Sequence, residues 1–309
     1  MKKFLRYIAL SLALLTALLC STGCSRANAE GAEEAAERNA AEKEARIREE
    51  EAVREEKREI LAAPIRTSFA AVGSVVSAAA EGYQPPLLTE DGALLLTYNE
   101  LVARLADPQT EADMQAWYGN TLFIGDSRTV GMAQYSGITG ADFFALTGMS
   151  VFDAFKGKVK LDQNAPDGTE VDLQTLLTEK KYDKIYLMLG INELGYSLPN
   201  IEKKYEDVTV RIKTLQPQAQ LWLQANMHVS QGRSDKDPTF NNITINNLNT
   251  AIKGIAQRQE TGWLDVNPVF DDANGHLDMG YTFDHTHLVG KHYKYWGLWI
   301  YLQSIHLGV

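Results

Sequence analysis

From residue 119 onward, short apolar runs alternate with amphipathic helical segments, and this alternation constrains the fold more than any other feature of the chain. The run at 184–190 (KIYLMLG) is continuously apolar, as in parallel strands buried on both faces of a sheet. Strands that alternate with helices predict right-handed crossovers. We therefore expect an α/β fold, a three-layer α/β/α sandwich around a five-stranded parallel sheet. The predicted strands are 121–125, 142–146, 184–190, 220–226 and 262–266, and the predicted helices are 130–135, 173–181, 200–215, 241–258 and 289–305.

Charge and cysteine content exclude several classes of protein. The chain has 309 residues, 40 of them acidic and 30 basic, for a net charge of −10. A nucleic-acid binder needs a basic face to neutralise phosphates, so we expect no nucleic-acid partner. The only cysteines are Cys20 and Cys24, so the remainder of the chain cannot form a disulfide or a cysteine metal cluster.

The N-terminus has the pattern of an export signal. Basic residues precede an apolar segment at 7–20, which is too short for a membrane span of about 20 residues. Ser21, Thr22 and Gly23 lead directly to Cys24. This order resembles a bacterial lipoprotein signal, in which the cysteine is lipidated, although Ser21 stands where leucine is usual. We predict a membrane-anchored lipoprotein outside the cytoplasm, at the cell surface or in the periplasm. An ordinary secretory signal and an uncleaved anchor are the alternatives.

Composition changes along the chain predict its domain organisation. Residues 30–59 contain twelve Glu against seven Lys or Arg and no aromatic residue, a composition typical of a solvated helix or a partly disordered spacer. Within the next segment, 98–105 is predicted as one amphipathic helix. The predicted divisions are 1–24, signal peptide or lipoprotein anchor; 25–62, charged stalk; 63–118, linker or accessory segment; and 119–309, α/β domain.

Reactive side chains follow the predicted strands. Ser127 comes directly after the first strand, Gly148 after the second and Asn192 after the third. Parallel α/β sheets bind ligands beyond the carboxyl ends of their strands, so these residues are expected to converge. A serine needs a base to act as a nucleophile, and His287, oriented by Asp284, can supply one. The backbone N–H groups of Ser127 and Gly148 and the Asn192 amide would be donors to an oxyanion.

Each of these residues also has a structural interpretation. Ser127 and Asp126 are both residue types that cap helices. Asp284, His285 and His287 could be metal ligands, but no second group of ligands accompanies them, so we expect no metal and no cofactor. His228 either lines the cleft or is a structural histidine, and the aromatic residues of the last segment are expected to be core.

Taken together, these positions resemble the SGNH (GDSL-type) hydrolases, which are named for blocks that carry Ser, Gly, Asn and His. The blocks are Phe-Ile-Gly-Asp-Ser at 123–127, Gly148, Gly-Ile-Asn-Glu at 190–193 and Asp-His-Thr-His-Leu at 284–288. The resemblance covers about residues 119–309 and implies a flavodoxin-like sandwich.

The resemblance also implies roles for five residues. Ser127 would be the nucleophile, His287 the base and Asp284 the acid of a triad. Ser127, Gly148 and Asn192 would form the oxyanion hole.

Two positions depart from the family pattern. Glu193 replaces the usual Asp and is expected to shift the loop that holds Asn192. Arg128 replaces the usual Leu and is expected to place a cation near the substrate.

The favoured hypothesis is a surface-anchored serine esterase that removes a small acyl group, such as acetyl, from an extracellular carbohydrate or cell-wall polymer. Its partners would be an acylated carbohydrate or another ester, and the membrane through the lipid on Cys24. An O-acyltransferase or a lipid esterase on the same fold is the first alternative. A non-catalytic binding module presented on a stalk is the second.

Overall fold

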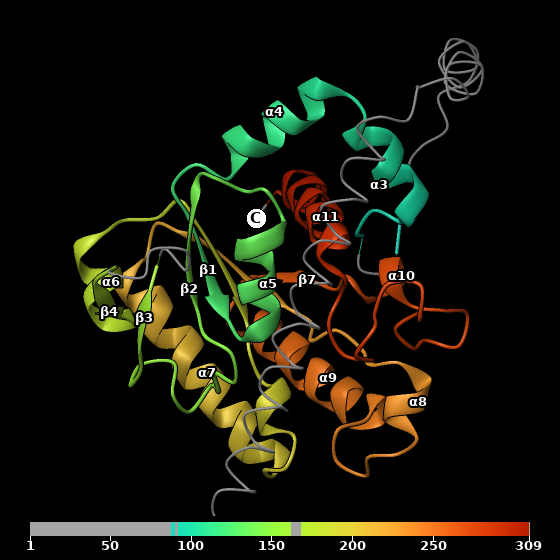
Figure 1. The fold of residues 1–309 in the computed structure, drawn as a ribbon. Coiled ribbons are helices and arrows are strands. Elements are labelled where there is room, and N and C mark those ends of the chain that lie inside the picture. Colours follow the sequence, from blue (N-terminus) through green and yellow to red (C-terminus); the bar gives the residue numbers. More distant parts are fainter. Residues whose placement is uncertain (1–87, 90–91, 162–167, 309) are drawn as a thin grey trace, which may run out of the picture. The chain divides into compact units, whose positions relative to one another are not determined.

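A five-stranded parallel sheet forms the centre of the computed structural model, which describes residues 88–89, 92–161 and 168–308 (Figure 1). Its strand order is β2-β1-β5-β6-β7, and every neighbouring pair is parallel. This confirms the predicted α/β fold and all five predicted strands. Cys24, the predicted signal and the predicted stalk lie outside the described residues. The strands are β1 (Thr121–Gly125), β2 (Ala141–Ala145), β5 (Lys184–Met188), β6 (Gln220–Gln224) and β7 (Gly262–Leu264).

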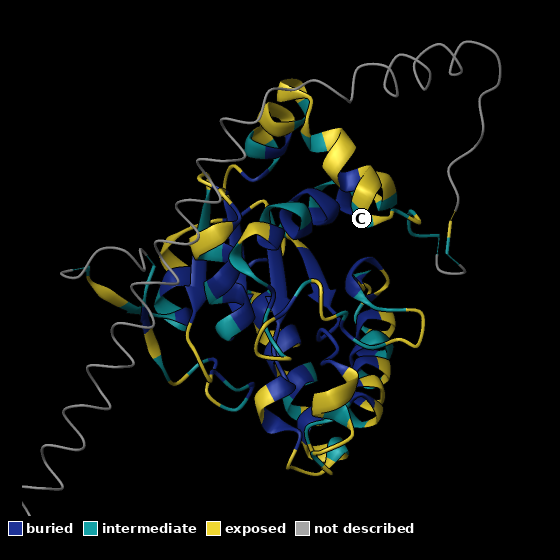
Figure 2. Ribbon diagram, turned by 45° about the vertical axis from the view of Figure 1, so that its right-hand side comes forward, coloured by how far each residue is buried: buried dark blue, intermediate teal, exposed yellow. Residues whose placement is uncertain are grey.

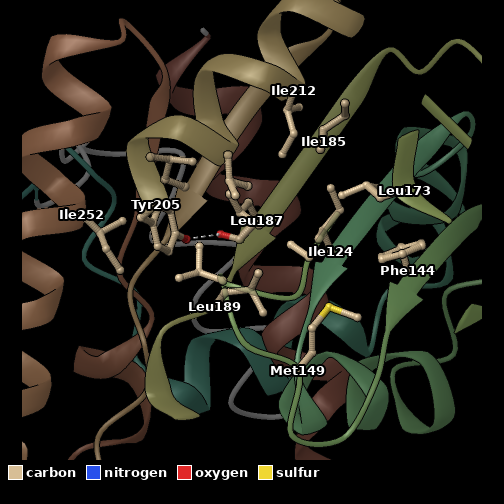
Figure 3. Close-up of a cluster of buried hydrophobic side chains, with 14 of the residues drawn as sticks. Ile124, Phe144, Met149, Leu173, Ile185, Leu187, Leu189, Tyr205, Ile212 and Ile252 are labelled. Carbon is tan, nitrogen blue, oxygen red and sulfur yellow. Dashed lines mark hydrogen bonds between the residues drawn. The ribbon is translucent and has the colours of Figure 1, made fainter. Parts of the chain in front are cut away.

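Helices cover both faces of the sheet, because successive strand residues point to opposite sides. Leu122 and Ile124 of β1 pack in one apolar cluster, which includes side chains of α6, α7 and α9 (Figure 3). Phe123 packs in a second cluster, on the other face, with side chains of α3, α4, α5 and α11. The helices are α3 (Tyr98–Leu105), α4 (Pro108–Trp117), α5 (Ser127–Tyr135), α6 (Leu173–Glu179), α7 (Leu198–Leu215), α9 (Asn242–Arg258) and α11 (Tyr293–Leu307).

A row of aromatic rings crosses the second face from strand to strand. Phe143, Phe123, Tyr186 and Trp222 occupy matching register positions on β2, β1, β5 and β6. Phe123 stacks on Phe143 with ring centroids 5.1 Å apart and on Tyr186 at 4.9 Å. The row ends at Gly262 of β7, where a Cβ atom would lie 2.1 Å from the Trp222 indole. Glycine at this position therefore leaves room for the largest side chain of the row.

The segment before the predicted α/β domain packs onto the last helix. Leu101 of α3 is fully buried, and the Tyr98 hydroxyl lies 2.7 Å from Nδ1 of His292. The hydroxyl of Tyr118, just after α4, donates to the carbonyl of Gly297 at 2.6 Å. Figure 2 shows α3 and α4 with exposed outer surfaces and buried inner ones. The helix predicted at 98–105 is confirmed as α3.

Several short elements were not predicted. They connect the main strands and helices, and each has few buried apolar residues to give a periodic pattern. In the described part of the chain, no helix combines the length and apolarity needed to cross a membrane. The short elements are β3 (Lys158–Lys160), β4 (Glu170–Asp172), α8 (Gln231–Ser234), α10 (Asn267–Phe270) and the 3₁₀ turns η1 (Ile191–Glu193) and η2 (Gly290–His292).

Candidate active site

The turn from β1 into α5 places Ser127 at the carboxyl edge of the sheet. Strand β1 ends at Gly125, and the carboxylate of Asp126 caps α5 by accepting the backbone N–H of Arg128 at 3.0 Å. A Cβ atom at Gly125 would lie 2.8 Å from the Met188 carbonyl of neighbouring β5. Glycine is therefore required for the close approach of two strands directly before the serine. The capping role considered for Ser127 belongs instead to Asp126.

A chain of hydrogen bonds joins Ser127 to the loop before α11. Its hydroxyl lies 2.8 Å from Nε2 of His287. Nδ1 of His287 lies 2.6 Å from Oδ2 of Asp284. The structure thus brings together a hydroxyl, an imidazole and a carboxylate that are separated by up to 160 positions in the chain.

The Asp284 carboxylate has more partners than the imidazole alone. Its Oδ1 accepts the backbone N–H groups of Thr286 at 2.9 Å and His287 at 2.7 Å. Burial alone would raise the pKa of this carboxyl, but these hydrogen bonds and the His287 ring outweigh burial and lower the pKa below its usual range. Asp284 is therefore ionised at neutral pH and holds the His287 ring by its Nδ1 side.

Gly148 and Asn192 lie in the loops that follow β2 and β5, at the same edge of the sheet as Ser127. Gly148 has φ +78°, a left-handed conformation that favours glycine. The side-chain amide of Asn192 donates to the carbonyl of Met149 at 2.9 Å, which ties the two loops together. Asn192 is exposed, so its amide is accessible to solvent.

Glu193 strengthens the same connection from inside the protein. Its side chain is fully buried, and one carboxylate oxygen accepts the backbone N–H of Val151. Burial raises the pKa of Glu193 to about 7, against the opposing effect of the Val151 hydrogen bond. Glu193, which stands where the family usually has Asp, thus lies beneath the loops that carry Gly148 and Asn192.

Arg128 does not face the substrate, so that expectation is wrong. The residue is only 1% exposed, because it follows Ser127 on the inner side of α5. Its Nη2 donates to the carbonyl of Thr286 at 3.4 Å, in the loop that carries His287. Burial raises the pKa of neighbouring Asp126, and the positive charge of Arg128 opposes that rise. The cation therefore joins the serine turn to the histidine loop from below.

His285 anchors the same loop through two contacts with Ser230. Its Nδ1 lies 2.7 Å from the Ser230 hydroxyl, and its carbonyl accepts the Ser230 backbone N–H at 3.0 Å. His285 has φ +68°, an uncommon conformation for a residue with a side chain. Over residues 88–89, 92–161 and 168–308, no three His, Cys, Asp or Glu side chains are grouped as a metal site.

His228 is a structural histidine. Its two ring nitrogens lie 2.7 Å from carboxylate and amide oxygens of Asp271 and Asn246. Tyr293 and Trp296 of α11 are buried in the core, as predicted.

Sequence reasoning missed the contacts that support the site. The hydrogen bonds made by Arg128, Glu193 and Ser230 all join segments far apart in the chain. The only sign of these contacts in the sequence is that residues 128 and 193 differ from the family pattern. This difference does not reveal which residues they contact.

Comparisons with known proteins identify the family of this chain. The model of the GDSL-like lipase/acylhydrolase family matches residues 123–295, more than half of the chain. A GDSL-like lipase from Bacteroides thetaiotaomicron is similar in structure, with 15% identity over 69% of this chain and 98% of that one, and a TM-score of 0.47. The acetylxylan esterase Axe2 from Geobacillus stearothermophilus has 17% identity over 62% and 96% of the two chains, and a TM-score of 0.41. No curated protein matches the chain. The chain belongs to the GDSL-like lipase/acylhydrolase family and is an ester-hydrolysing serine hydrolase.

Proposed function

We propose that this protein is an extracytoplasmic, membrane-anchored serine esterase that removes small acyl groups, such as acetyl, from a carbohydrate or cell-wall polymer. The observation that carries the catalytic part is the continuous hydrogen-bond chain Ser127–His287–Asp284, with distances of 2.8 and 2.6 Å. The anchoring part rests on the sequence before Cys24.

In the first half of the reaction, the Ser127 oxygen attacks the ester carbonyl carbon as Nε2 of His287 takes the hydroxyl proton. Asp284 stabilises the imidazolium through Nδ1. The backbone N–H groups of Ser127 and Gly148 and the Asn192 amide donate to the oxyanion, each such donor contributing about 3 kcal/mol to transition-state stabilisation. His287 returns the proton to the leaving alcohol as the C–O bond breaks, which leaves an acyl group on Ser127.

In the second half, water replaces the alcohol. His287 takes a proton from the water as its oxygen attacks the acyl carbon, and the new tetrahedral intermediate collapses. The acid is released and the proton returns to the Ser127 oxygen, so the enzyme is regenerated.

Hydrolysis of 4-nitrophenyl acetate by the full chain tests the catalytic part. We expect Ser127→Ala to lower kcat by about 10⁴-fold or more, with an unchanged circular dichroism spectrum. Equal rates for the two proteins would overturn the proposal. Failure of a fluorophosphonate probe to label Ser127 would favour the non-catalytic binding module instead.

Acyl length and acceptor separate the remaining alternatives. We expect faster hydrolysis of acetyl than of octanoyl esters, whereas the reverse order would indicate a lipid esterase. Transfer of the acetyl group to an added sugar alcohol in preference to water would indicate an O-acyltransferase.

Lipidation is tested in cells that express the full chain. An alkyne-labelled fatty acid should be incorporated into the parent and not into Cys24→Ala. Equal incorporation, or none in either protein, would contradict a lipid anchor at Cys24.

A further inference from the structure

A cavity of about 390 Å³ lies beyond the two loops that carry Gly148 and Asn192. Phe152 follows Gly148 by four positions, and Tyr196 follows Asn192 by four. Four residues span at most about 14 Å, so both aromatic residues lie within reach of a molecule bound at the proposed oxyanion hole. The cavity is lined by Phe152, Tyr196, Asn200, Lys203, Lys204 and Asp207.

Aromatic rings form one wall of this cavity. The rings of Phe152 and Tyr196 have centroids 5.2 Å apart and planes inclined at 40°. Tyr196 is 63% exposed, although it is a large and partly apolar residue. An exposed aromatic face in a hollow beside a reaction site suits a ligand with an apolar face and polar edges, and the C–H face of a sugar ring has that character.

The other lining residues come from α7 and carry a net positive charge. Lys203 forms an ion pair with Asp207 at 2.8 Å, which neutralises one charge of each sign. Lys204 forms no ion pair with any residue in the described part of the chain, so one positive charge is left over at the cavity. In a chain with a net charge of −10, a cavity with excess positive charge is a local exception that favours an anionic ligand.

We propose that this cavity binds a sugar ring bearing an acidic group, within the alcohol part of the ester substrate. The ring stacks on Tyr196, and the acidic group lies against Lys204. The proposal rests on the esterase function above and narrows it: the polymer that this enzyme deacylates is an acidic glycan. Asn200 adds an amide that can hydrogen-bond to ring hydroxyls.

Competing substrates test this specificity. The full chain is assayed on acetylated oligogalacturonide, which is acidic, on acetylated xylo-oligosaccharide, which is neutral, and on 4-nitrophenyl acetate. For each oligosaccharide we take the ratio of its kcat/KM to the kcat/KM for the aryl ester. We expect Lys204→Gln to lower this ratio at least tenfold for the acidic substrate and to change it less than twofold for the neutral substrate. Tyr196→Ala should lower the ratio for both oligosaccharides, and Tyr196→Phe should retain it.

Lys181→Gln is the matched control, because Lys181 is an exposed lysine just before β5, at the opposite edge of the sheet from the site. It should leave all ratios unchanged. Added NaCl should reduce the preference for the acidic substrate, since salt screens the charge of the half-buried Lys204. Equal effects of Lys204→Gln on the acidic and neutral oligosaccharides would overturn the proposal.

A binding measurement separates this proposal from the esterase function. Calorimetry with the full-chain Ser127→Ala variant and oligogalacturonide without acetyl groups needs no catalysis. We expect oligogalacturonide to bind to Ser127→Ala, and to bind at least tenfold more weakly to the double variant Ser127→Ala/Lys204→Gln. Undetectable or equal binding of acidic and neutral oligosaccharides, with normal aryl-ester hydrolysis by the parent, would overturn the cavity assignment alone. Loss of aryl-ester hydrolysis in the parent would overturn the esterase function and leave the binding result interpretable.

Discussion

The carboxylate of Glu193 accepts a hydrogen bond from the backbone of Val151, so a fully buried acid connects the loop after β5 to the loop after β2. These are the loops that carry Asn192 and Gly148, two of the three proposed donors to the oxyanion. The two loops of the proposed oxyanion hole are therefore joined by one buried side chain.

Glu193 should make stability depend on pH. Burial raises its pKa from 4.5 to about 7, so the folded protein binds this proton more tightly than the unfolded chain. The free energy of unfolding should therefore fall as pH rises from about 4.5 to about 7, by on the order of 2 kcal/mol from this group. Glu193→Gln keeps an acceptor for Val151 but cannot ionise, so it should flatten that slope. Urea unfolding at several pH values measures it, and an unchanged slope in the variant would contradict the assignment.

Arg128→Leu restores the residue usual in the family, yet it should destabilise this protein. It leaves the buried Asp126 without the positive charge that opposes the rise in its pKa, so the free energy of unfolding should fall. It also removes the hydrogen bond to Thr286, so kcat should fall together with stability. Urea unfolding and aryl-ester kinetics at pH 7 measure both effects.

The double variant Arg128→Leu/Asp126→Asn provides the control for that change. Removal of both charges should recover part of the lost stability, since no uncompensated charge remains buried. If the two single changes simply add, Asp126 and Arg128 do not interact.

Asp284→Asn should leave the fold intact and lower kcat by about 10³- to 10⁴-fold. The amide oxygen can still accept the backbone N–H groups of Thr286 and His287, but it no longer offers a carboxylate to Nδ1. The imidazole then loses its preferred tautomer and the charge that stabilises its protonated form. Steady-state kinetics with thermal unfolding as a control checks this, and a loss of less than tenfold would be inconsistent with Asp284 as the acid of the triad.

Gly125→Ala should disturb the turn that carries Ser127, because the added methyl group would clash with β5. The new methyl group would lie 2.8 Å from the Met188 carbonyl and 2.0 Å from Oγ1 of Thr129. Such overpacking costs about 1–3 kcal/mol and should displace Ser127, so both Tm and kcat should fall. Gly157→Ala is a suitable comparison, because its methyl group would meet only the Asp153 carbonyl, at an ordinary 3.7 Å. Equal effects of the two changes would argue against a special role for Gly125.

The sequence predicted the sheet well because its strands are buried on both faces. The strand predicted at 121–125 has the bounds of β1, all five residues of which are buried. Helix α4 was not predicted, because Met114 is its only buried residue. Its sequence therefore shows no apolar residues repeated at helical spacing. The Asp107-Pro108 pair at its start was the available signal, since both residues favour the first turn of a helix.

The residues of the candidate site also include some that the sequence predicts and some that it does not. Ser127 and His287 could be predicted because the ends of parallel strands meet at one edge and a serine nucleophile requires a base. The burial of Arg128 could not be predicted, since a charged residue is ordinarily exposed. Only its partners in the folded chain explain where it lies. Patterns within one segment thus predict elements, whereas contacts between distant segments require the structure.

The 160 positions between Ser127 and His287 have a consequence for synthesis. A ribosome adds about 5–20 residues each second, so the imidazole is made roughly 8 to 30 seconds after the hydroxyl that it is proposed to activate. Throughout that interval the nascent chain holds a serine of ordinary, low reactivity. In the proposed mechanism, esters near the site of translation therefore meet no working catalyst until the loop that carries His287 has been made and α11 has docked.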